Sequence, residues 1–349
     1  MNQRVVIAGG GAVGLAAAAS LARRGVQVVV CDSAPLGDNA SGVAAGMLAP
    51  AMETAFDPST AGHYPMLNAA RGLWPAFAQA HGVMLDSSGA VAVGEPAVVE
   101  TWARRLSEAG APFEYLTAAE AGALVPGLAE GLGGLRSRED LRLRAPQALT
   151  ALKASAGADG AQFVDRLVTG WTDSEAVLAD GRTLAADWLV IATGGGHELE
   201  AIAPELAAVS PIKGQIAQAR DVVFDGPVLR GEGIYVCPSP DGVIVGATME
   251  QGRSDRAVDP EVIETLTARA SRLLPALKDA RFEASAAVRG ATADGMPLVG
   301  PVATPGVILA VGARRNGWLL APVIANMIAA YVDNEDAGPL AARFDPRRF

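Results

Sequence analysis

A glycine-rich turn between a strand and a helix, close to the start of the chain, is the feature that most constrains the fold. In "VVIAGGGAVGL", a buried-strand pattern leads into Gly9, Gly11 and Gly14, which are spaced as G-x-G-x-x-G. The first glycine of such a pattern allows a tight turn, the second lets a pyrophosphate approach the backbone, and the third lets the helix pack closely on the strand. Residues 12–24 are predicted to form that helix, and Gly25 to end it.

An acidic residue completes the pattern after the second strand. Residues 26–31 are predicted to form this strand, and Asp32 follows it, 18 residues after Gly14. A carboxylate at this place can accept hydrogen bonds from the two hydroxyls of an adenosine ribose, and it disfavours the 2′-phosphate of NADP. The combination predicts a dinucleotide site, for FAD or NAD, rather than an ordinary glycine-rich turn.

Two later stretches favour FAD. Residues 33–52 are rich in small residues and contain neither Lys nor Glu, so they are predicted to form a long loop that a flat ring can approach closely. Residues 163–195 are predicted to form three strands, at 163–169, 176–178 and 188–192. Their return to a strand that ends in Ala-Thr-Gly resembles the FAD enzymes of the glutathione-reductase-like fold.

Composition excludes several classes of partner. The 349-residue chain has a net charge of −10 and no run of Lys or Arg, which disfavours nucleic acid and anionic membranes. Cys31 and Cys237 form neither a metal-binding spacing nor a disulfide framework, so no metal site is predicted. We expect no signal peptide, and the apolar run 318–332 is shorter than the ~20 residues that span a bilayer. A cytoplasmic protein is expected.

Five blocks, in order along the chain, resemble one family. They are "VVIAGGGAVGL", "ASGVAAGMLAP", "IYVCPSPDGVIVGATME", "VRGATADGMPLVGP" and "GARRNGWLLAP". With them the chain resembles the D-amino-acid-oxidase-like FAD-dependent oxidoreductases, and among these the bacterial glycine oxidases of thiamine biosynthesis. The resemblance implies a non-covalently bound FAD and the two-electron oxidation of a small amine or amino acid.

The resemblance also implies an α/β fold with two domains. A glutathione-reductase-like, FAD-binding Rossmann domain is expected from residues 1–76, 146–209 and 286–349. Residues 77–145 and 210–285 are expected to form an inserted substrate domain of the α+β type, built on an antiparallel sheet.

Within the two insertions the sequence predicts local elements. A hairpin is expected at 83–94, a helix at 96–109, and a capping box between Thr117 and Glu120. A second hairpin, with a Pro-Asp-Gly turn, is expected in "GIYVCPSPDGVIVGATM", and a further helix in "DPEVIETLTARASRLLPAL".

Positions that would contact FAD follow from the resemblance. Ala12, Val13, Asp32 and Ser33 would contact the adenosine and pyrophosphate, and Val168 the adenine through its backbone. Residues of the small-residue loop would line the flavin, and residues 313–319 would surround the pyrimidine edge of its ring. The full expected set is Gly9, Gly11, Ala12, Val13, Gly14, Asp32, Ser33, Ala40, Ser41, Ala45, Gly46, Met47, Val168, Gly194, Gly312, Ala313, Arg314, Arg315, Asn316, Gly317, Trp318 and Leu319.

The last strand and helix have a chemical reason to lie beside the flavin. Residues 307–311 are predicted to form a buried strand, and 318–332 an apolar helix that starts just after the Asn316-Gly317 turn. Reduced flavin carries negative charge on N1 and the C2 carbonyl. A helix N-terminus offers free N–H groups and a partial positive charge to such an anion.

Three residues match the family's substrate-binding positions: Tyr235, Arg289 and Arg315. An arginine can hold a carboxylate with two parallel hydrogen bonds, and the tyrosine hydroxyl can add a third. Their work would be to orient the substrate so that hydride passes from Cα to flavin N5. No acid or base need touch the carbon, so no further catalytic residue and no catalytic histidine is assigned. Arg289 could instead lie at the surface, and Arg314 is expected to be solvated or salt-bridged.

Some positions depart from the family pattern. Ala313 and Arg314 stand where a histidine or aromatic residues are common, and Trp318 stands where a smaller aliphatic residue is common. All three are expected near the pyrimidine edge of the flavin. These departures bear on the flavin potential and on the shape of the substrate pocket, and leave the expectation of a flavin intact.

The expected reaction is the oxidative deamination of glycine or another small amine or amino acid, with an imine product and O2 reduced to hydrogen peroxide, serving thiazole synthesis for thiamine. The alternative is an FAD-dependent D-amino-acid dehydrogenase that passes electrons to a quinone; the chain has no basic amphipathic stretch for docking at a membrane. The acidic charge disfavours a flavin-bound tRNA-modification domain, and an arginine pair for substrate would have no purpose in a non-catalytic binding module. Besides the substrate and O2, a homo-oligomeric partner stays open.

Overall fold

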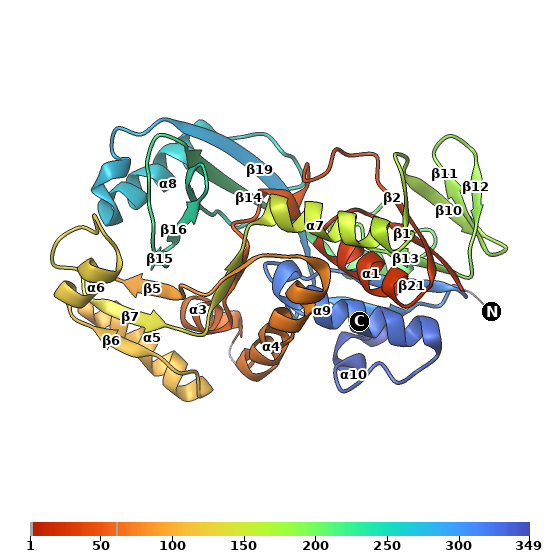
Figure 1. Ribbon diagram of the computed structural model, residues 1–349, viewed down its shortest axis with the longest axis horizontal. Helices are drawn as coiled ribbons and strands as arrows, with labels where there is room; N and C mark the ends of the chain where they lie inside the picture. The colour runs from red at the N-terminus through yellow and green to blue at the C-terminus, as the bar shows by residue number, and fades with distance from the viewer. Residues whose placement is uncertain (1–2, 61) are drawn as a thin grey trace.

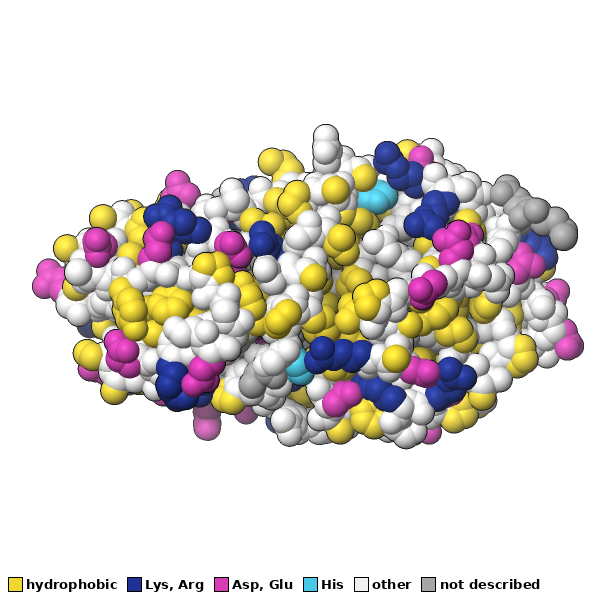
Figure 2. Space-filling model, turned by 90° about the horizontal axis from the view of Figure 1, so that it is seen from below, with side chains coloured by type: hydrophobic (Ala, Val, Ile, Leu, Met, Phe, Trp, Pro, Cys, Tyr) yellow, Lys and Arg dark blue, Asp and Glu magenta, His cyan; other side chains and the backbone are white. Residues whose placement is uncertain are grey.

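The computed structural model describes residues 3–60 and 62–349. The molecule is elongated, with a six-stranded sheet in one half and a nine-stranded sheet in the other (Figure 1). On the face seen in Figure 2, Lys and Arg side chains alternate with Asp and Glu and do not gather into a basic patch. Among the helices of the described residues, none has both the length and the apolar character needed to cross a bilayer.

The six-stranded sheet is of the parallel type that the glycine-rich turn predicts. Its strands are β1 (Arg4–Ala8), β2 (Gln27–Cys31), β9 (Gln162–Val164), β13 (Trp188–Ile191), β20 (Leu298–Pro301) and β21 (Val307–Val311). The order across the sheet is β20-β21-β13-β1-β2-β9, and only β20, at one edge, runs antiparallel to its neighbour. Because both faces are covered, β1 and β21 are buried almost throughout.

Helices cover one face of this sheet, and a small antiparallel sheet covers the other. The helices are α1 (Ala12–Arg23), α4 (Tyr64–His81), α7 (Ala145–Ala158) and α9 (Gly317–Asp333); the small sheet is β10 (Val168–Thr172), β11 (Glu175–Leu178) and β12 (Thr183–Ala185). Val5 and Ile7 of β1 pack on the helical side, whereas Val6 and Ala8 pack on the side of the small sheet. The alanines 16–19 are fully buried, so α1 packs closely against α9. The predicted fold class is confirmed.

The nine-stranded sheet is mostly antiparallel. Its strands are β5 (Ala90–Val93), β6 (Glu114–Leu116), β7 (Gly134–Ser137), β14 (Ser210–Ala219), β15 (Val228–Gly231), β16 (Ile234–Ser239), β17 (Gly242–Gly246), β18 (Glu250–Gln251) and β19 (Phe282–Ala291). Eight of them follow the order β18-β14-β17-β16-β15-β5-β7-β6, while β19 pairs with β14. Both predicted insertions, 77–145 and 210–285, therefore contribute strands to this one sheet. The domain boundaries themselves stay a prediction.

The remaining elements are short or lie on the outside of the nine-stranded sheet. They are the helices α2 (Ala40–Val43), α3 (Pro50–Phe56), α5 (Pro96–Ala109), α6 (Ala118–Leu124), α8 (Pro260–Leu273) and α10 (Ala341–Phe344), the 3-10 helices η1 (Pro58–Thr60), η2 (Pro204–Ala208), η3 (Pro275–Leu277) and η4 (Pro346–Arg348), and a third sheet of β3 (Met47–Leu48), β8 (Leu141–Leu143) and β4 (Leu85–Asp86). The predicted helix at 96–109, the Thr117–Glu120 capping box and the second hairpin, formed by β16 and β17, are confirmed.

Three local predictions are wrong. The stretch 163–169 is two strands, because the exposed residues 165–167 redirect the chain from β9 into β10 of a different sheet. The segment 83–94 is no hairpin, since β4 pairs with β8 and β5 pairs with β7 and β15. The expected loop 33–52 contains the helical turn α2, whose N-terminus is capped by the Asn39 side chain, as well as β3 and the start of α3.

Candidate active site

A first cavity lies at the carboxyl ends of the parallel strands, the place where open α/β sheets bind ligands. Its volume is about 400 Å³. Most of the positions expected to contact a dinucleotide line it: Gly9, Gly11, Ala12, Val13, Asp32, Ala40, Ser41, Val168, Gly194, Gly312, Ala313, Arg314, Arg315, Gly317 and Trp318. Segments from both ends of the chain and from its middle thus meet around one cavity.

The three glycines of the fingerprint each have the steric role that the pattern predicts. Gly9 has a φ of +116°, and a Cβ on it would lie 2.5 Å from the carbonyl oxygen of Ala192. A Cβ on Gly14 would lie 2.0 Å from the carbonyl oxygen of Gly9, so the helix can approach the turn only with glycine there. At Gly11 a Cβ would meet only the Ser41 side chain, with its oxygen 3.1 Å away, and the backbone is open to the cavity.

The acid at the end of β2 holds this turn in shape. One carboxylate oxygen of Asp32 accepts a hydrogen bond from the Gly10 N–H at 2.7 Å, and the other accepts one from the Ala34 N–H at 2.9 Å. The side chain is half-buried and lines the cavity. Asp32 is therefore both a support of the glycine turn and a carboxylate within reach of a ligand.

Helix α2 ties the two helix N-termini of the first cavity together. The Ser41 hydroxyl accepts a hydrogen bond from the Ala12 N–H, at the start of α1, at 2.9 Å. The Trp318 indole, at the start of α9, donates to the Ser41 carbonyl oxygen at 3.0 Å. Trp318, one of the departures from the family pattern, is thus a structural link as well as a wall of the cavity.

A second cavity of about 570 Å³ adjoins the first, and Ala44, Arg289, Arg315 and Trp318 line both. The expected positions that do not line the first cavity fall into two groups. Ala45, Gly46, Met47, Asn316 and Tyr235 line the second cavity, whereas Gly14, Ser33 and Leu319 line neither. The side chain of Leu319 is buried in the core, because its place on α9 turns it away from the strand ends.

Tyr235 and Arg289 lie on the same face of the nine-stranded sheet. Tyr235 pairs with Gly246 of β17, and Arg289 pairs with Ile212 of β14. A Cβ on Gly246 would lie 2.4 Å from the Tyr235 hydroxyl, and a Cβ on Gly214 would lie 2.4 Å from the Arg289 guanidinium. Two glycines in neighbouring strands therefore leave the space in which the tyrosine and the arginine lie flat across the sheet.

The Arg289 guanidinium forms only weak contacts with the protein. Its Nη1 is 3.4 Å from the Thr248 carbonyl oxygen and 3.3 Å from the Met249 sulfur, and no carboxylate of the described residues forms an ion pair with it. Burial lowers the pKa of Arg289 and raises the pKa of Tyr235 to about 12, so the phenol keeps its proton at neutral pH. Both side chains face the second cavity as hydrogen-bond donors.

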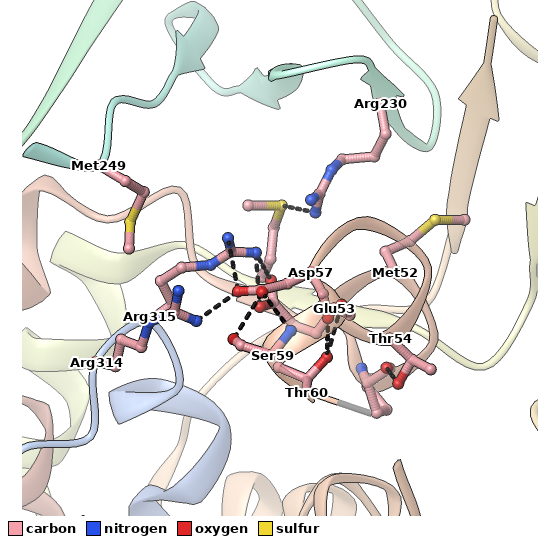
Figure 3. A network of polar contacts seen from close by, with 12 residues as sticks. Met52, Glu53, Thr54, Asp57, Ser59, Thr60, Arg230, Met249, Arg314 and Arg315 are labelled. Carbon is pink, nitrogen blue, oxygen red and sulfur yellow. Dashed lines mark hydrogen bonds and ion pairs between the residues drawn. The ribbon is translucent and has the colours of Figure 1, made fainter. Parts of the chain in front are cut away.

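Arg315, in contrast, is already paired with protein carboxylates. Its Nη2 lies 2.6 Å from both carboxylate oxygens of Glu53, and its Nη1 lies 3.6 Å from Asp57 (Figure 3). Arg314 forms its own ion pair with Asp57 at 2.5 Å, which confirms the salt-bridged alternative for that residue. The charge of Glu53 raises the pKa of Arg315; for Asp57, burial raises the pKa, but hydrogen bonds from Ser59 and Arg314 outweigh it and lower the pKa to about 2.

Helix α3, which carries Glu53 and Asp57, is held by a buried acid from another segment. The two carboxylate oxygens of Asp140 accept hydrogen bonds from the Ala51 and Met52 N–H groups, each at 3.1 Å. These are free N–H groups of the first helical turn, so Asp140 acts as an N-cap supplied from a distance. Burial raises the pKa of Asp140 to about 6.

The sequence did not predict three charged residues that line the second cavity, Glu53, Arg230 and Arg269, nor the two acids that support this region, Asp57 and Asp140. Glu53 and Asp57 follow Pro50 with helical i, i+4 spacing, a signal just beyond the expected loop 33–52 that the sequence-based prediction did not use. Arg230 pairs with Tyr235 across the β15–β16 turn, so the hairpin itself could have pointed to it. Asp140 has no sequence signal, since its partners are backbone groups almost ninety residues away.

Comparison with known proteins decides which dinucleotide the first cavity suits. Residues 4–331 match the family model described as DAO, FAD dependent oxidoreductase. The chain belongs to this family. FAD is therefore the cofactor of this oxidoreductase, and the predictions of an FAD enzyme and of the family are confirmed.

Three relatives show how close the likeness is. The oxidoreductase is 32% identical to the bifunctional protein ThiO/ThiG of Trichormus variabilis over all of this chain, but it spans only 55% of that protein's length. It is 30% identical to the glycine oxidase of Geobacillus kaustophilus, and the alignment covers 95% of this chain and 93% of the relative. The crystal structure of a glycine oxidase from that species superposes on this chain with a TM-score of 0.87 at 28% identity, and the match covers 99% of each chain. The iminodiacetate oxidase of Chelativorans sp. BNC1 covers 99% of both chains at 25% identity, with a TM-score of 0.85.

Proposed function

We propose that this FAD-dependent oxidoreductase oxidises glycine or another small amino acid to an imine, with O2 as the electron acceptor and hydrogen peroxide as the second product. The observation that carries the proposal is the position of Tyr235, Arg289 and Arg315 around the second cavity, directly beside the first. The relatedness to glycine oxidases supports the same substrate class. The imine would serve thiazole synthesis for thiamine, in the cytoplasm.

The first cavity fits FAD in its steric and its charged features. The N-terminus of α1 would take the pyrophosphate at Gly11, Ala12 and Val13, because its N–H groups and partial charge favour an anion. Asp32 would accept hydrogen bonds from the adenosine ribose. The start of α9, at Gly317 and Trp318, would lie at the pyrimidine edge of the flavin.

Binding and orientation are the tasks of the protein side chains. Arg289 would hold the substrate carboxylate with parallel hydrogen bonds, since no carboxylate of the described residues pairs with it. The protonated Tyr235 would donate a further hydrogen bond, and Arg315, kept in place by Glu53, would contribute positive charge. Bound FAD supplies the acceptor for the two electrons removed from the substrate. Fixing the carboxylate in this way would keep the Cα–H bond directed at the junction of the two cavities.

The proposal is tested by reduction of the purified holoenzyme in the absence of oxygen. Glycine, sarcosine or D-alanine should bleach the flavin absorbance, and admission of air should restore it with release of one peroxide per flavin. A flavin that no amine bleaches contradicts amino-acid oxidation. A bleached flavin that is reoxidised only after a quinone is added favours the dehydrogenase.

Arg289→Met provides the matching test of the site. Loss of the anchoring guanidinium should raise KM about 100-fold while FAD stays bound, since a charge-assisted pair is lost. Arg281→Met, an exposed arginine just before the same strand, is the control and should keep the KM of the wild type. Equal KM values for the two variants contradict the assignment.

A further inference from the structure

Arg230 is a buried arginine for which the proposed reaction has no use. It lies on β15, opposite Tyr235, and is only 5% exposed. Its contacts are the Met47 sulfur, 3.6 Å from Nη1, and the face of the Phe56 ring, whose centroid is 4.7 Å from the guanidinium carbon. Its Nε has no hydrogen-bond partner, and no carboxylate of the described residues lies within ion-pair distance.

The second cavity consequently holds more positive charge than one carboxylate would neutralise. Its lining includes four arginines, Arg230, Arg269, Arg289 and Arg315, and a single acid, Glu53. That acid is bound to Arg315 through both of its oxygens. Glu53 and the buried Asp140 act on Arg230 only through space, without an ion pair among the described residues. A buried guanidinium without a directly bound counter-charge is costly, so a ligand that brings a second negative charge would be favoured.

The sheet register places Arg230 where the far end of a substrate would lie. Arg230, Tyr235 and Gly246 are successive cross-strand neighbours, and their side chains stand on one face of the sheet together with Arg289. Between Arg230 and Arg289 lie Tyr235 of β16, Gly246 of β17 and strand β14, whose Gly214 lies under the Arg289 guanidinium. In Figure 3 it extends from β15 toward the side of the cavity where Glu53 and Arg315 lie.

We propose that Arg230 binds a second carboxylate of the substrate, so that the enzyme prefers amines with two acidic groups. This inference rests on the proposed function, in which Arg289 and Tyr235 hold the first carboxylate. The second group can sit on the nitrogen, as in iminodiacetate, or on the side chain, as in D-aspartate and D-glutamate. Both kinds of substrate present the same chemistry to Arg230.

The first experiment compares substrates on the wild-type holoenzyme. Rates of anaerobic flavin reduction are measured with iminodiacetate, D-aspartate and D-glutamate, and with their single-carboxylate counterparts sarcosine, D-alanine and glycine. At least one diacid should have a kcat/KM about 10-fold or more above its counterpart, and the better class shows where the second carboxylate sits. Reduction by the single-carboxylate amines alone overturns this inference and leaves the proposed function standing. Reduction by no amine overturns both.

The second experiment removes the charge from Arg230. Arg230→Met should raise KM for the preferred diacid about 10- to 100-fold, with kcat and the KM for the single-carboxylate counterpart changed by less than about 3-fold. Arg230→Lys, which keeps the charge, should retain most of the preference. Arg272→Met on α8, an exposed arginine outside the second cavity, is the matched control.

Two outcomes would overturn the role of Arg230. One is a KM for the diacid that rises no more than the KM for its counterpart, which would make Arg230 a structural counter-charge for Glu53. The other is an Arg230→Lys enzyme that has full FAD content but no preference for the diacid. This second outcome decides the matter if Arg230→Met does not retain FAD.

Discussion

Arg315 and Glu53 form an ion pair in which one guanidinium nitrogen lies 2.6 Å from both carboxylate oxygens. The arginine follows the last strand of the six-stranded sheet, and the glutamate lies on α3, whose N-terminus is held by Asp140. Of the two arginines predicted to bind substrate, one is therefore fixed by the protein, whereas Arg289 has no carboxylate partner among the described residues. The first would shape the cavity and the second would bind.

Glu53→Gln should destabilise the holoenzyme. Arg315 stays largely buried after this change, and among the described residues its one remaining charged contact is with Asp57 at 3.6 Å. The loss of unfolding free energy should be about 1–3 kcal/mol, between the values for exposed and fully buried pairs. Chemical denaturation at saturating FAD measures it. Glu283→Gln, which breaks an exposed pair with Arg220, is the control. Equal midpoints for the two variants would show that the buried pair adds no stability.

Asp57 should make the protein more sensitive to acid. Although burial raises its pKa, hydrogen bonds from Ser59 and Arg314 lower it overall to about 2, from 3.8 in the unfolded chain. A carboxylate whose folded pKa is depressed stabilises the fold above its unfolded pKa, and this contribution is lost as pH falls toward the folded value. Between pH 5 and pH 3 the wild type should therefore lose about 1 kcal/mol more than Asp57→Asn.

Unfolding free energies of the two proteins at several pH values in this range test the expectation for Asp57. Asp279→Asn, an exposed carboxylate without an ion pair among the described residues, should follow the wild type. Parallel curves for wild type and Asp57→Asn would mean that the Arg314 pair does not hold the charge in the folded state.

The sequence predicts the fold and the site well where the residues that act together are close to one another in the chain. The glycines 9, 11 and 14 and the acid Asp32 lie within one strand–helix–strand unit, and their roles follow from backbone sterics that any such unit shares. The helix at 317–333 was predictable for the same reason, because its apolar run and starting turn are contiguous.

The charged surroundings of the second cavity depend instead on contacts between distant segments. Glu53 reaches Arg315 over 262 positions, and Asp140 caps a helix 88 positions away. Small residues hid the helical pattern of 50–56. The β15–β16 hairpin places Arg230 opposite Tyr235, but no local signal shows that this arginine is buried without an ion pair among the described residues. Sequence alone therefore predicted Arg315 as a substrate-binding arginine and could not show its ion pair with Glu53.

Asp32→Ala should weaken FAD binding more than Asp32→Asn does. Alanine removes both the ribose acceptor and the partner of the Gly10 N–H, which the carboxylate binds at 2.7 Å. Asparagine keeps one acceptor oxygen. The FAD dissociation constant of Asp32→Ala should rise about 10- to 100-fold, measured by flavin fluorescence during reconstitution of the apoenzyme. Asp38→Ala, which removes an exposed ion pair with Arg256, is the control. An unchanged constant in Asp32→Ala would refute the ribose assignment.

Gly214→Ala should damage substrate binding with little effect on the fold. The new Cβ would lie within 2.4–2.6 Å of the Arg289 guanidinium, the far end of a flexible side chain that can move aside. The displaced arginine should raise KM for the amine about 10-fold. FAD content and Tm should stay close to those of the wild type.

Gly122→Ala is the matched control for Gly214→Ala, because its new Cβ, on the exposed side of α6, would have no atom within 4 Å in the part of the chain that the structure describes. It should leave KM unchanged and raise helix stability slightly. If Gly214→Ala instead keeps the KM of the wild type while Arg289→Met does not, then the arginine binds substrate from a position other than the one it holds over Gly214. The space over Gly214 in β14 would then have no part in substrate recognition.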